Sequence, residues 1–222
     1  MTRFWLIRHG QSRSNAGFAT GDTETIPLTG LGHRQAVLGS QTIAETFGSP
    51  ELIVASPYLR AQQTAQPTRE RFPTVPFETW PVQEFTYLHF SGETVYSERL
   101  PRIDAYWRGA DPESKDAPGY ESFNDLMARV EDCAERLRAC PHATVVVFTH
   151  CRFIQLFLWR WLLRSVDQAR DEMETFWGAR HLIRVPNLGY VQGDVLEDGT
   201  LSMCPIQTIV EGELATPLPK GA

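Results

Sequence analysis

The stretch FWLIRHGQS, residues 4–12, decides the fold because it joins two kinds of sequence that rarely meet. Its first four residues are all apolar, which is typical of a strand covered on both faces, as in a parallel sheet between two layers of helices. Arg8, His9 and Gly10 follow at once. Arginine and histidine are poor core residues. Their position therefore predicts that the strand delivers them to a site at its carboxyl end.

Length and composition indicate a single globular domain. The chain has 222 residues, of which 42% are hydrophobic and 22% charged, whereas one domain usually has about 100 to 200 residues. The net charge of −6 at pH 7 argues against nucleic acid or an anionic membrane as a partner, because both would repel an acidic surface. We expect one hydrophobic core and no such partner.

Neither an export signal nor a membrane span is expected. The apolar run at residues 4–7 is too short for the core of a signal peptide. The run at 153–163 is about half as long as a membrane span and contains Arg160, so we expect a buried helix there. The four cysteines form no CxxC pair, which indicates neither a zinc site nor a disulfide framework. We expect a cytoplasmic protein without a metal ion or other cofactor.

Two further apolar runs, at residues 51–55 and 144–148, have the same character as the first. Helical patterns lie between the runs. Thr29 is suited to cap a helix that ends at Gly48, and apolar residues recur at helical spacing over 123–140. Strands that alternate with helices predict an α/β fold. We expect a three-layer sandwich with a mostly parallel central sheet and helices on both faces.

The last part of the chain is expected to complete this sheet at one edge. Asp198 and Gly199 are suited to a hairpin turn between two strands. The expected strands lie within residues 181–185, 190–199 and 201–208. Residues 1–211 are thus expected to form one domain, and the Pro- and Gly-rich residues 212–222 a loose tail.

Polar residues follow each of the three strand runs directly or within one helical turn. They are Arg8 and His9 after the first run, Ser56 and Arg60 after the second, and Thr149 and His150 after the third. Because the carboxyl ends of parallel strands lie at one edge of the sheet, these side chains should converge. If residues 81–85 form a further strand, Glu84 joins them.

Two arginines, two histidines and a carboxylate are suited to phosphoryl transfer. The guanidinium fork matches phosphate oxygens, neutral imidazole is a nucleophile, and a carboxylic acid can protonate the leaving alkoxide. Each group alone is a weak signal, because a lone histidine or arginine is usually structural or exposed. Their supply by four separate segments favours a catalytic site for a small phosphorylated substrate.

These segments give the chain a resemblance to the histidine phosphatase superfamily, in its phosphoglycerate mutase-like branch. The similar segments follow the family's order between residues 3 and 155, and they are LIRHGQSRSN, PLTGLGHRQA, VASPYLRAQQTA, VQEF, GYESFNDLMARV and VVVFTHCRFIQ. The resemblance implies a three-layer α/β sandwich and a phosphohistidine intermediate that forms without a metal ion. Our hypothesis from these residues is a hydrolase that acts on phosphomonoesters.

The resemblance also implies a catalytic set and a phosphate-binding set of residues. The catalytic set is His9 as the phosphorylated nucleophile, Glu84 as the proton donor and His150 as the second histidine. The phosphate-binding set is Arg8, Arg60, Asn15 and His150.

One position departs from the family pattern. The family usually has glycine after the second histidine, whereas Cys151 follows His150 here. Glycine adopts backbone conformations that other residues avoid, so the cysteine could change how His150 is presented. The His-Cys pair also raises the alternative of a cysteine-dependent phosphatase, in which an arginine follows after five residues. Phe157 occupies that position, which argues against this alternative.

Two further functions fit the same residues. A phosphoglycerate-type mutase would return the phosphoryl group to its product before water intervenes, and a non-catalytic protein would only bind a phosphorylated ligand. The aromatic- and arginine-rich segment 86–118 is expected to be either an insertion packed on the domain or a lid over the site. The apolar residues of 153–163 fit an oligomer interface as well as a core.

Overall fold

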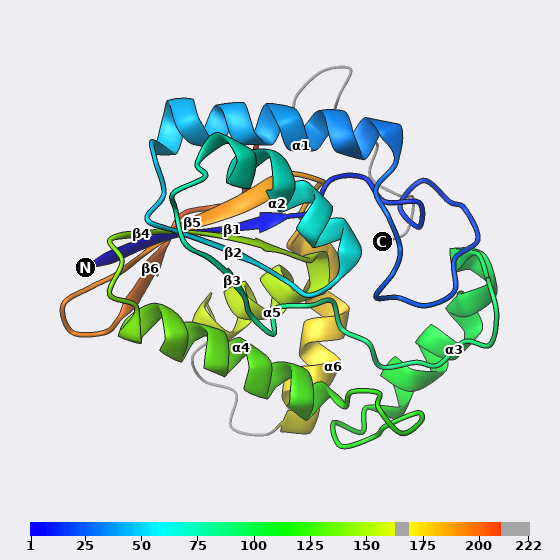
Figure 1. Ribbon diagram of the computed structural model, residues 1–222. Coiled ribbons are helices and arrows are strands. Elements are labelled where there is room, and N and C mark those ends of the chain that lie inside the picture. The colour runs from blue at the N-terminus through cyan, green and yellow to red at the C-terminus, as the bar shows by residue number, and fades with distance from the viewer. Residues whose placement is uncertain (163–168, 210–222) are drawn as a thin grey trace.

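A computed structural model describes residues 1–162 and 169–209 of the chain (Figure 1). In this part of the chain, seven strands form one mixed sheet with the order β3-β2-β4-β1-β5-β6, and β7 pairs with β5. The parallel strands are β1 (Thr2–Arg8), β2 (Leu52–Ala55), β3 (Phe77–Thr79) and β4 (Thr144–Thr149). The antiparallel strands are β5 (Gly189–Val195), β6 (Leu201–Met203) and β7 (Gln207–Thr208). The sheet is thus parallel through most of its width.

Helices cover both faces of the sheet, which confirms the expected α/β sandwich (Figure 1). One face carries α1 (Gly30–Thr42), its π-helical continuation η1 (Ile43–Phe47) and α2 (Leu59–Arg71). The other carries α4 (Phe123–Ala139), α5 (Cys151–Leu162), α6 (Ala169–Ala179) and the short η2 (Arg180–Leu182). Helix α3 (Tyr96–Gly109) lies to one side of the sheet and packs against α6.

The apolar run of β1 lacks alternation because both of its faces are buried. Phe4 and Leu6 belong to the core formed with α4, α5 and α6. Trp5 and Ile7 belong to the second core, on the side of α1 and α2. Successive residues of a strand point to opposite faces, so a strand between two helical layers needs apolar residues at every position. This central strand carries Arg8 at its carboxyl end.

The predicted helix start at Thr29 is confirmed, and the helix predicted over 123–140 is capped by the residue before it, Ser122. The Thr29 hydroxyl accepts a hydrogen bond from Gly32 N at the start of α1. Ser122 caps α4 in the same way, and its own N–H donates to the Asp125 carboxylate. The continuous helix formed by α1 and η1 ends at Gly48, as predicted, and the φ of 80° there suits a residue without a Cβ.

Two expected strands are wrong. Residues 81–85 form no strand, because Pro81 has no N–H for a ladder and the Arg129 guanidinium takes the carbonyls of Pro81 and Gln83 at 2.9 and 3.0 Å. Residues 181–185 fall in η2 and the loop after it. The hairpin between β5 and β6 is confirmed, with Gly199 at a φ of 78°.

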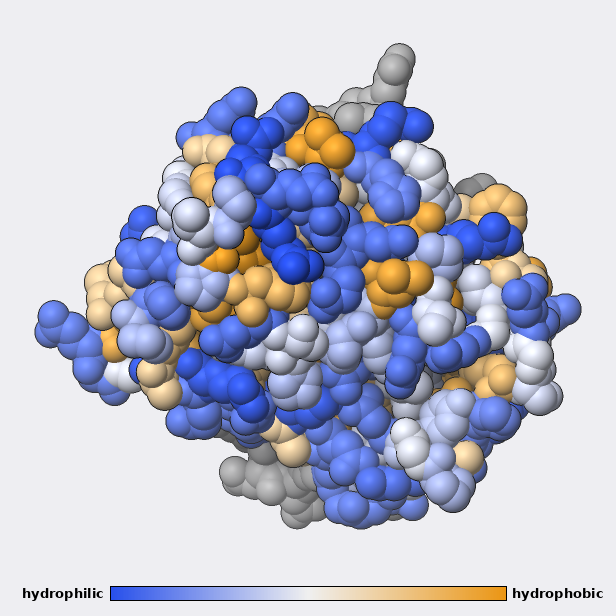
Figure 2. Space-filling model, viewed as in Figure 1, coloured by the Kyte–Doolittle hydropathy of each residue, from blue (hydrophilic) through white to orange (hydrophobic). Residues whose placement is uncertain are grey.

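The remaining expectations concern a membrane span, the buried helix at 153–163 and the loose C-terminal tail. On the face seen in Figure 2, hydrophobic residues form small separate groups among hydrophilic ones. Across residues 1–162 and 169–209, no helix is both long enough and apolar enough to cross a membrane. The expected loose tail, residues 212–222, lies outside the described residues, as does position 163 at the end of the expected buried helix.

Candidate active site

The carboxyl ends of β1 and β4 bring the two histidines together, as the sequence predicts. Arg8 and Thr149 are paired as the last residues of these neighbouring parallel strands. His9 and His150 come directly after them, and the His9 N–H donates to the Thr149 carbonyl at 3.0 Å. The two imidazole rings lie 5.0 Å apart, centroid to centroid. Adjacent parallel strands thus fix the spacing of the pair.

The His9 imidazole is held by a contact at each ring nitrogen. Nδ1 lies 2.7 Å from the carbonyl oxygen of Gly10. Because a carbonyl can only accept, Nδ1 carries the ring proton in the neutral imidazole. Nε2 then has the lone pair, which accepts a hydrogen bond from Arg60 Nε at 3.2 Å. A lone pair at Nε2 is what an attack on phosphorus requires.

Burial keeps both histidines neutral near neutral pH. It lowers the pKa of His9 well below the ordinary value of 6.5, and the positive charges of Arg60 and Arg8 lower it further. Burial also lowers the pKa of His150 well below that value, with Arg60 as the next cause. Protonation would place a third charge beside two guanidinium groups. His9 is therefore present as the free base that a nucleophile must be.

The same shifts predict a loss of stability in acid. Below pH 6.5, the ordinary histidine pKa, the unfolded chain binds protons that the folded protein does not, so the free energy of unfolding should decrease as pH falls. The slope is up to about 1.4 kcal/mol per pH unit for each histidine. Urea unfolding between about pH 7.5 and pH 5.5 should give a shallower slope for His9→Asn than for the wild type. Equal slopes would contradict the shift at His9.

Two buried arginines lie beside His9 without acidic partners. Arg60 is 4% and Arg8 9% exposed. Arg60 Nη1 donates to the Thr23 carbonyl at 2.6 Å, and Arg8 Nη1 donates to the Val185 carbonyl, also at 2.6 Å. Arg8 Nε is buried with no hydrogen-bond partner. Burial lowers the pKa of Arg60 to about 10. Within the described residues neither arginine forms an ion pair, so both guanidinium groups have charge available for an anion.

His150 offers a further donor to the same site. Its Nε2 lies 2.8 Å from the Ser56 hydroxyl. That hydroxyl already accepts from Tyr58 N at 3.2 Å, so it can give its own proton to His150 Nε2. In this tautomer Nδ1 carries the ring proton, and Nδ1 is buried without a partner. Ser56, which follows the second strand run, thus orients His150.

Glu84 reaches the site although its segment is not a strand. Its Oε1 accepts from Arg152 N at 3.0 Å, in the first turn of α5, and from Phe85 N at 3.1 Å. The negative charge of Glu84 also acts on Arg60, where it raises the pKa against the effect of burial. Glu84 therefore lies at this end of the sheet, but a contact with α5 places it there and a strand does not.

An internal ion pair holds the segment that carries Glu84. Arg129 and Glu121 are paired at 2.5 Å, with side chains only 12% and 16% exposed. Arg129 also binds the carbonyls of Pro81 and Gln83, before Glu84, and Glu121 accepts from Thr86 N at 3.1 Å. The segment is fixed on both sides of Glu84, which keeps its carboxylate at the end of α5.

Asn15 lies in the loop after His9 and is held by a residue that the sequence did not indicate. Its Oδ1 accepts from Asn187 Nδ2 at 3.1 Å, and the same Asn187 amide donates to the His9 carbonyl at 2.9 Å. Asn187 is buried. Its only local signal is the sequence Pro-Asn-Leu-Gly, which indicates a turn and nothing about a site.

The loop after His9 lies directly on the first turn of α1, which explains two glycines. A Cβ on Gly32 would lie 2.1 Å from the carbonyl oxygen of Gln11, and one on Gly10 would lie 2.7 Å from that of Gly32. Neither position has room for a side chain. The sequence around Gly32 therefore fixes the position of the loop that carries Gln11 and Asn15.

Cys151 causes no backbone strain. In the described chain only Ala110 and Leu188 have a positive φ among residues other than glycine, so Cys151 needs no glycine-like conformation. It is the first residue of α5, with its Sγ 4.0 Å from the Val185 carbonyl. Phe157 is fully buried in the same helix. Because a helix follows Cys151, the phosphate loop of a cysteine-dependent phosphatase is not formed here.

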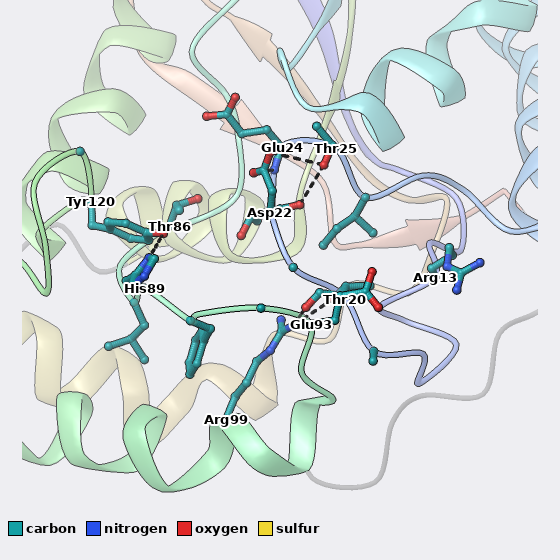
Figure 3. A pocket seen from close by; sticks show the side chains of 18 of the residues that line it. Arg13, Thr20, Asp22, Glu24, Thr25, Thr86, His89, Glu93, Arg99 and Tyr120 are labelled. Carbon is teal, nitrogen blue, oxygen red and sulfur yellow. Dashed lines mark hydrogen bonds between the residues drawn. The ribbon is translucent and has the colours of Figure 1, made fainter.

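A cavity of about 730 Å³ adjoins this site (Figure 3). Its walls come from residues 19–27, 86–93 and 118–120, with Arg13 and Arg99. Two pairs of contacts connect it with the histidines. Thr23 accepts from Arg60, which donates to His9, and the Thr86 hydroxyl lies 2.6 Å from that of Tyr58, whose ring packs edge-on against His150. Figure 3 shows Asp22 and Glu24 on a different wall from His89 and Tyr120.

Segment 86–118 both packs on the domain and lines the cavity. Trp107 stacks on Trp177 at 4.4 Å, and Tyr87 packs against Trp107. At the cavity, the Arg99 guanidinium donates to the carbonyls of Thr20 and Thr94 and to both hydroxyls. The two cavity walls are thereby joined.

The parts of the structure that are described contain no cluster of three or more His, Cys, Asp or Glu side chains that could hold a metal ion.

Comparison with known proteins identifies the family. The sequence model of the histidine phosphatase superfamily (branch 1) matches residues 4–175. No curated protein sequence matches the chain significantly.

Several solved structures share the fold at low sequence identity. A mycobacterial glucosyl-3-phosphoglycerate phosphatase, in complex with VO3, has a TM-score of 0.69 and 23% identity over 92% of this chain and 98% of its own. A phosphoserine phosphatase mutant from Entamoeba histolytica, in complex with phosphoserine, has a TM-score of 0.65 and 22% identity over 94% and 98%. The α-ribazole phosphatase from Shigella flexneri has a TM-score of 0.68 and 19% identity over 95% and 98%. At these identities the likeness concerns the fold.

Proposed function

Because the chain belongs to the histidine phosphatase superfamily (branch 1), we propose that it is a phosphomonoesterase that forms a phosphohistidine on His9 without a metal ion. The observation that carries this proposal is the environment of His9. Two buried arginines without acidic partners lie beside a neutral imidazole whose Nε2 lone pair faces one of them. A dianionic phosphate would satisfy both guanidinium groups and bring phosphorus to that lone pair.

The residues around His9 give a complete reaction in this proposal. Arg8, Arg60 and His150 Nδ1 bind the phosphate oxygens, and Asn15 supports them from the adjacent loop. His9 Nε2 attacks phosphorus as the bond to the leaving oxygen breaks. Charge on the equatorial oxygens is stabilised mainly by the guanidinium groups.

Glu84 handles the proton in both halves of the reaction. In its acid form it protonates the leaving oxygen, and the product alcohol departs. As a carboxylate it then accepts a proton from a water molecule that attacks the phosphohistidine, which releases phosphate and restores His9. The free oxygen for this role is Oε2, since Oε1 already accepts two backbone hydrogen bonds.

The adjoining cavity supports a small phosphorylated substrate. Its walls would hold the alcohol part of the substrate, and segment 86–118 would act as a lid whose position depends on Arg99. The named phosphatases among the similar structures also act on small phosphorylated compounds. We propose that residues 1–211 form one domain that carries this activity. All four cysteines are free, which supports a reducing, cytoplasmic location.

Hydrolysis with EDTA present tests this function. We expect p-nitrophenyl phosphate to release nitrophenol and phosphate at equal rates, and 3-phosphoglycerate with a bisphosphate primer to give glycerate and phosphate rather than 2-phosphoglycerate. Formation of 2-phosphoglycerate would instead indicate the mutase. Tight binding of phosphate esters by folded protein without turnover would indicate a non-catalytic binding protein. Loss of all activity with EDTA would contradict the metal-independent mechanism.

A further inference from the structure

We propose that Arg152 and Arg180 form a second anion-binding site beside the phosphate site, which selects substrates with a carboxylate or a second phosphate on the leaving group. This inference rests on the proposed function, because the ligand it describes is the ester that His9 attacks. It concerns residues that neither the family resemblance nor the phosphate site assigns.

Both arginines lie on one aromatic platform. The Arg180 guanidinium carbon is 3.3 Å from the centroid of the Trp177 ring, and that of Arg152 is 5.4 Å from it. Trp107 stacks on Trp177 with an interplanar angle of 3° and a centroid distance of 4.4 Å. Because Trp107 covers one face of the indole, Arg180 lies over the other. The platform therefore fixes where the two positive charges can point.

Neither arginine has an acidic partner in residues 1–162 or 169–209. Arg152 Nη1 donates to the amide oxygen of Gln155 at 2.6 Å, and Arg180 Nη1 donates to the Trp177 carbonyl. Arg180 Nε is buried without any hydrogen-bond partner. Other arginines form ion pairs, namely Arg3, Arg102, Arg129, Arg136, Arg138 and Arg160.

The two charges are close enough to oppose each other. Burial lowers the pKa of Arg180, and the charge of Arg152 lowers it further, while Tyr96, Asp104 and Tyr87 act in the opposite direction. Two guanidinium groups that repel each other are brought together at a cost in free energy. An anion bound by both would remove this repulsion and supply a partner for Arg180 Nε.

The position of this pair relative to Glu84 makes it a part of the substrate site. Arg152 is two residues after His150, and its N–H holds the Glu84 carboxylate. In the proposed reaction Glu84 protonates the leaving oxygen, so the leaving group must lie next to Glu84 and close to the first turn of α5. The charges of Arg152 and Glu84 both act on Tyr87, whose neighbours Thr86 and Leu88 line the cavity. We therefore place Arg152 at the end of the cavity next to Glu84, where the leaving group begins.

The loop that carries Arg180 also contacts the phosphate site. Gln155 Nε2 donates to the carbonyls of Arg180 and Ile183 at 3.0 and 2.7 Å. Two residues further on, the Val185 carbonyl accepts from Arg8. The loop thus connects the Trp177 platform with Arg8, and the same loop supports both anion sites.

Matched substrates test the second site. The probes are glycerol 3-phosphate against 3-phosphoglycerate, and fructose 6-phosphate against fructose 1,6-bisphosphate, which separate a carboxylate from a second phosphate. We expect the wild type to favour one doubly acidic ester by kcat/KM. Arg180→Gln should reduce that preference by roughly 10- to 100-fold, as expected for loss of a charge-assisted contact. Arg184→Gln, an exposed arginine of the same loop, should keep the preference.

Two outcomes would overturn the second site: an unchanged preference in Arg180→Gln, or an equal loss for both members of each pair, which would indicate a structural role. Calorimetric binding of the same four compounds separates this inference from the proposed function. The wild type could hydrolyse none of these compounds and still bind a doubly acidic ester more tightly than its partner. If Arg180→Gln then loses this binding preference, the result supports the second anion site and contradicts the proposed phosphatase activity. Equal binding of all four compounds would exclude the site.

Discussion

His9→Ala is expected to lower kcat for phosphomonoester hydrolysis by about 10⁴-fold or more. The substitution removes the imidazole whose Nε2 lone pair faces Arg60, while its Nδ1 is engaged by the Gly10 carbonyl. His150 cannot replace it in this mechanism, because its Nε2 is occupied by Ser56. Initial rates with p-nitrophenyl phosphate would measure the loss.

The variant leaves a space beside intact arginines, which allows a sharper test. Added imidazole should enter this space and restore part of the activity, because phosphate binding by Arg8 and Arg60 is unaffected. His33→Ala, at an exposed position of α1, is the matched control and should retain wild-type rates. Substantial turnover by His9→Ala without imidazole would exclude a phosphohistidine on His9.

Arg60→Met is expected to lower kcat/KM by about 10³-fold, the scale at which one arginine stabilises a phosphoryl transition state. Arg60 donates a hydrogen bond to His9, the nucleophile, and its guanidinium group is one of the two charges that would bind the phosphate. Methionine keeps much of the apolar volume but supplies no charge and no donor. The pKa of His9 should then rise toward its ordinary value, since the second cause of its depression is removed.

The same variant should be as stable as the wild type or more stable. Arg60 is buried, burial lowers its pKa to about 10, and it has no ion pair in the described chain. A buried charge without a partner costs stability, so its removal offsets the lost hydrogen bond to Thr23 and the stacking on Tyr58. Urea unfolding would measure this at pH 7.5, about the optimum range for most folded proteins.

Arg69→Met is the control on the same helix. Arg69 lies over the Phe77 ring at 3.8 Å, beside the edge strand β3 and away from the two histidines. Its kcat/KM should stay at the wild-type value. A clear drop in the stability of Arg60→Met, together with a small drop in activity, would show that Arg60 is structural and would contradict its role at phosphorus.

Local sequence was sufficient wherever neighbouring residues determine the structure. Unbroken apolar runs identified the buried parallel strands, Thr29 identified one helix start, and the apolar period over 123–140 identified a second helix. The prediction of a strand at residues 81–85 was wrong because carbonyls of this segment are bound by Arg129, more than forty residues later in the chain. Such a contact leaves no periodic signal in either segment.

The sequence by itself determined the three central strands, their alternation with helices, and the meeting of Arg8, His9 and His150. Strand ends need only a hydrophobic pattern and a parallel sheet to converge. The tertiary structure alone decided the support of these residues: Asn187 beneath His9, the ion pair that holds Glu84, and the placing of Arg152 and Arg180 on Trp177. These contacts join segments far apart in the chain. The packing of side chains in three dimensions selects these contacts, and local sequence preferences do not encode them.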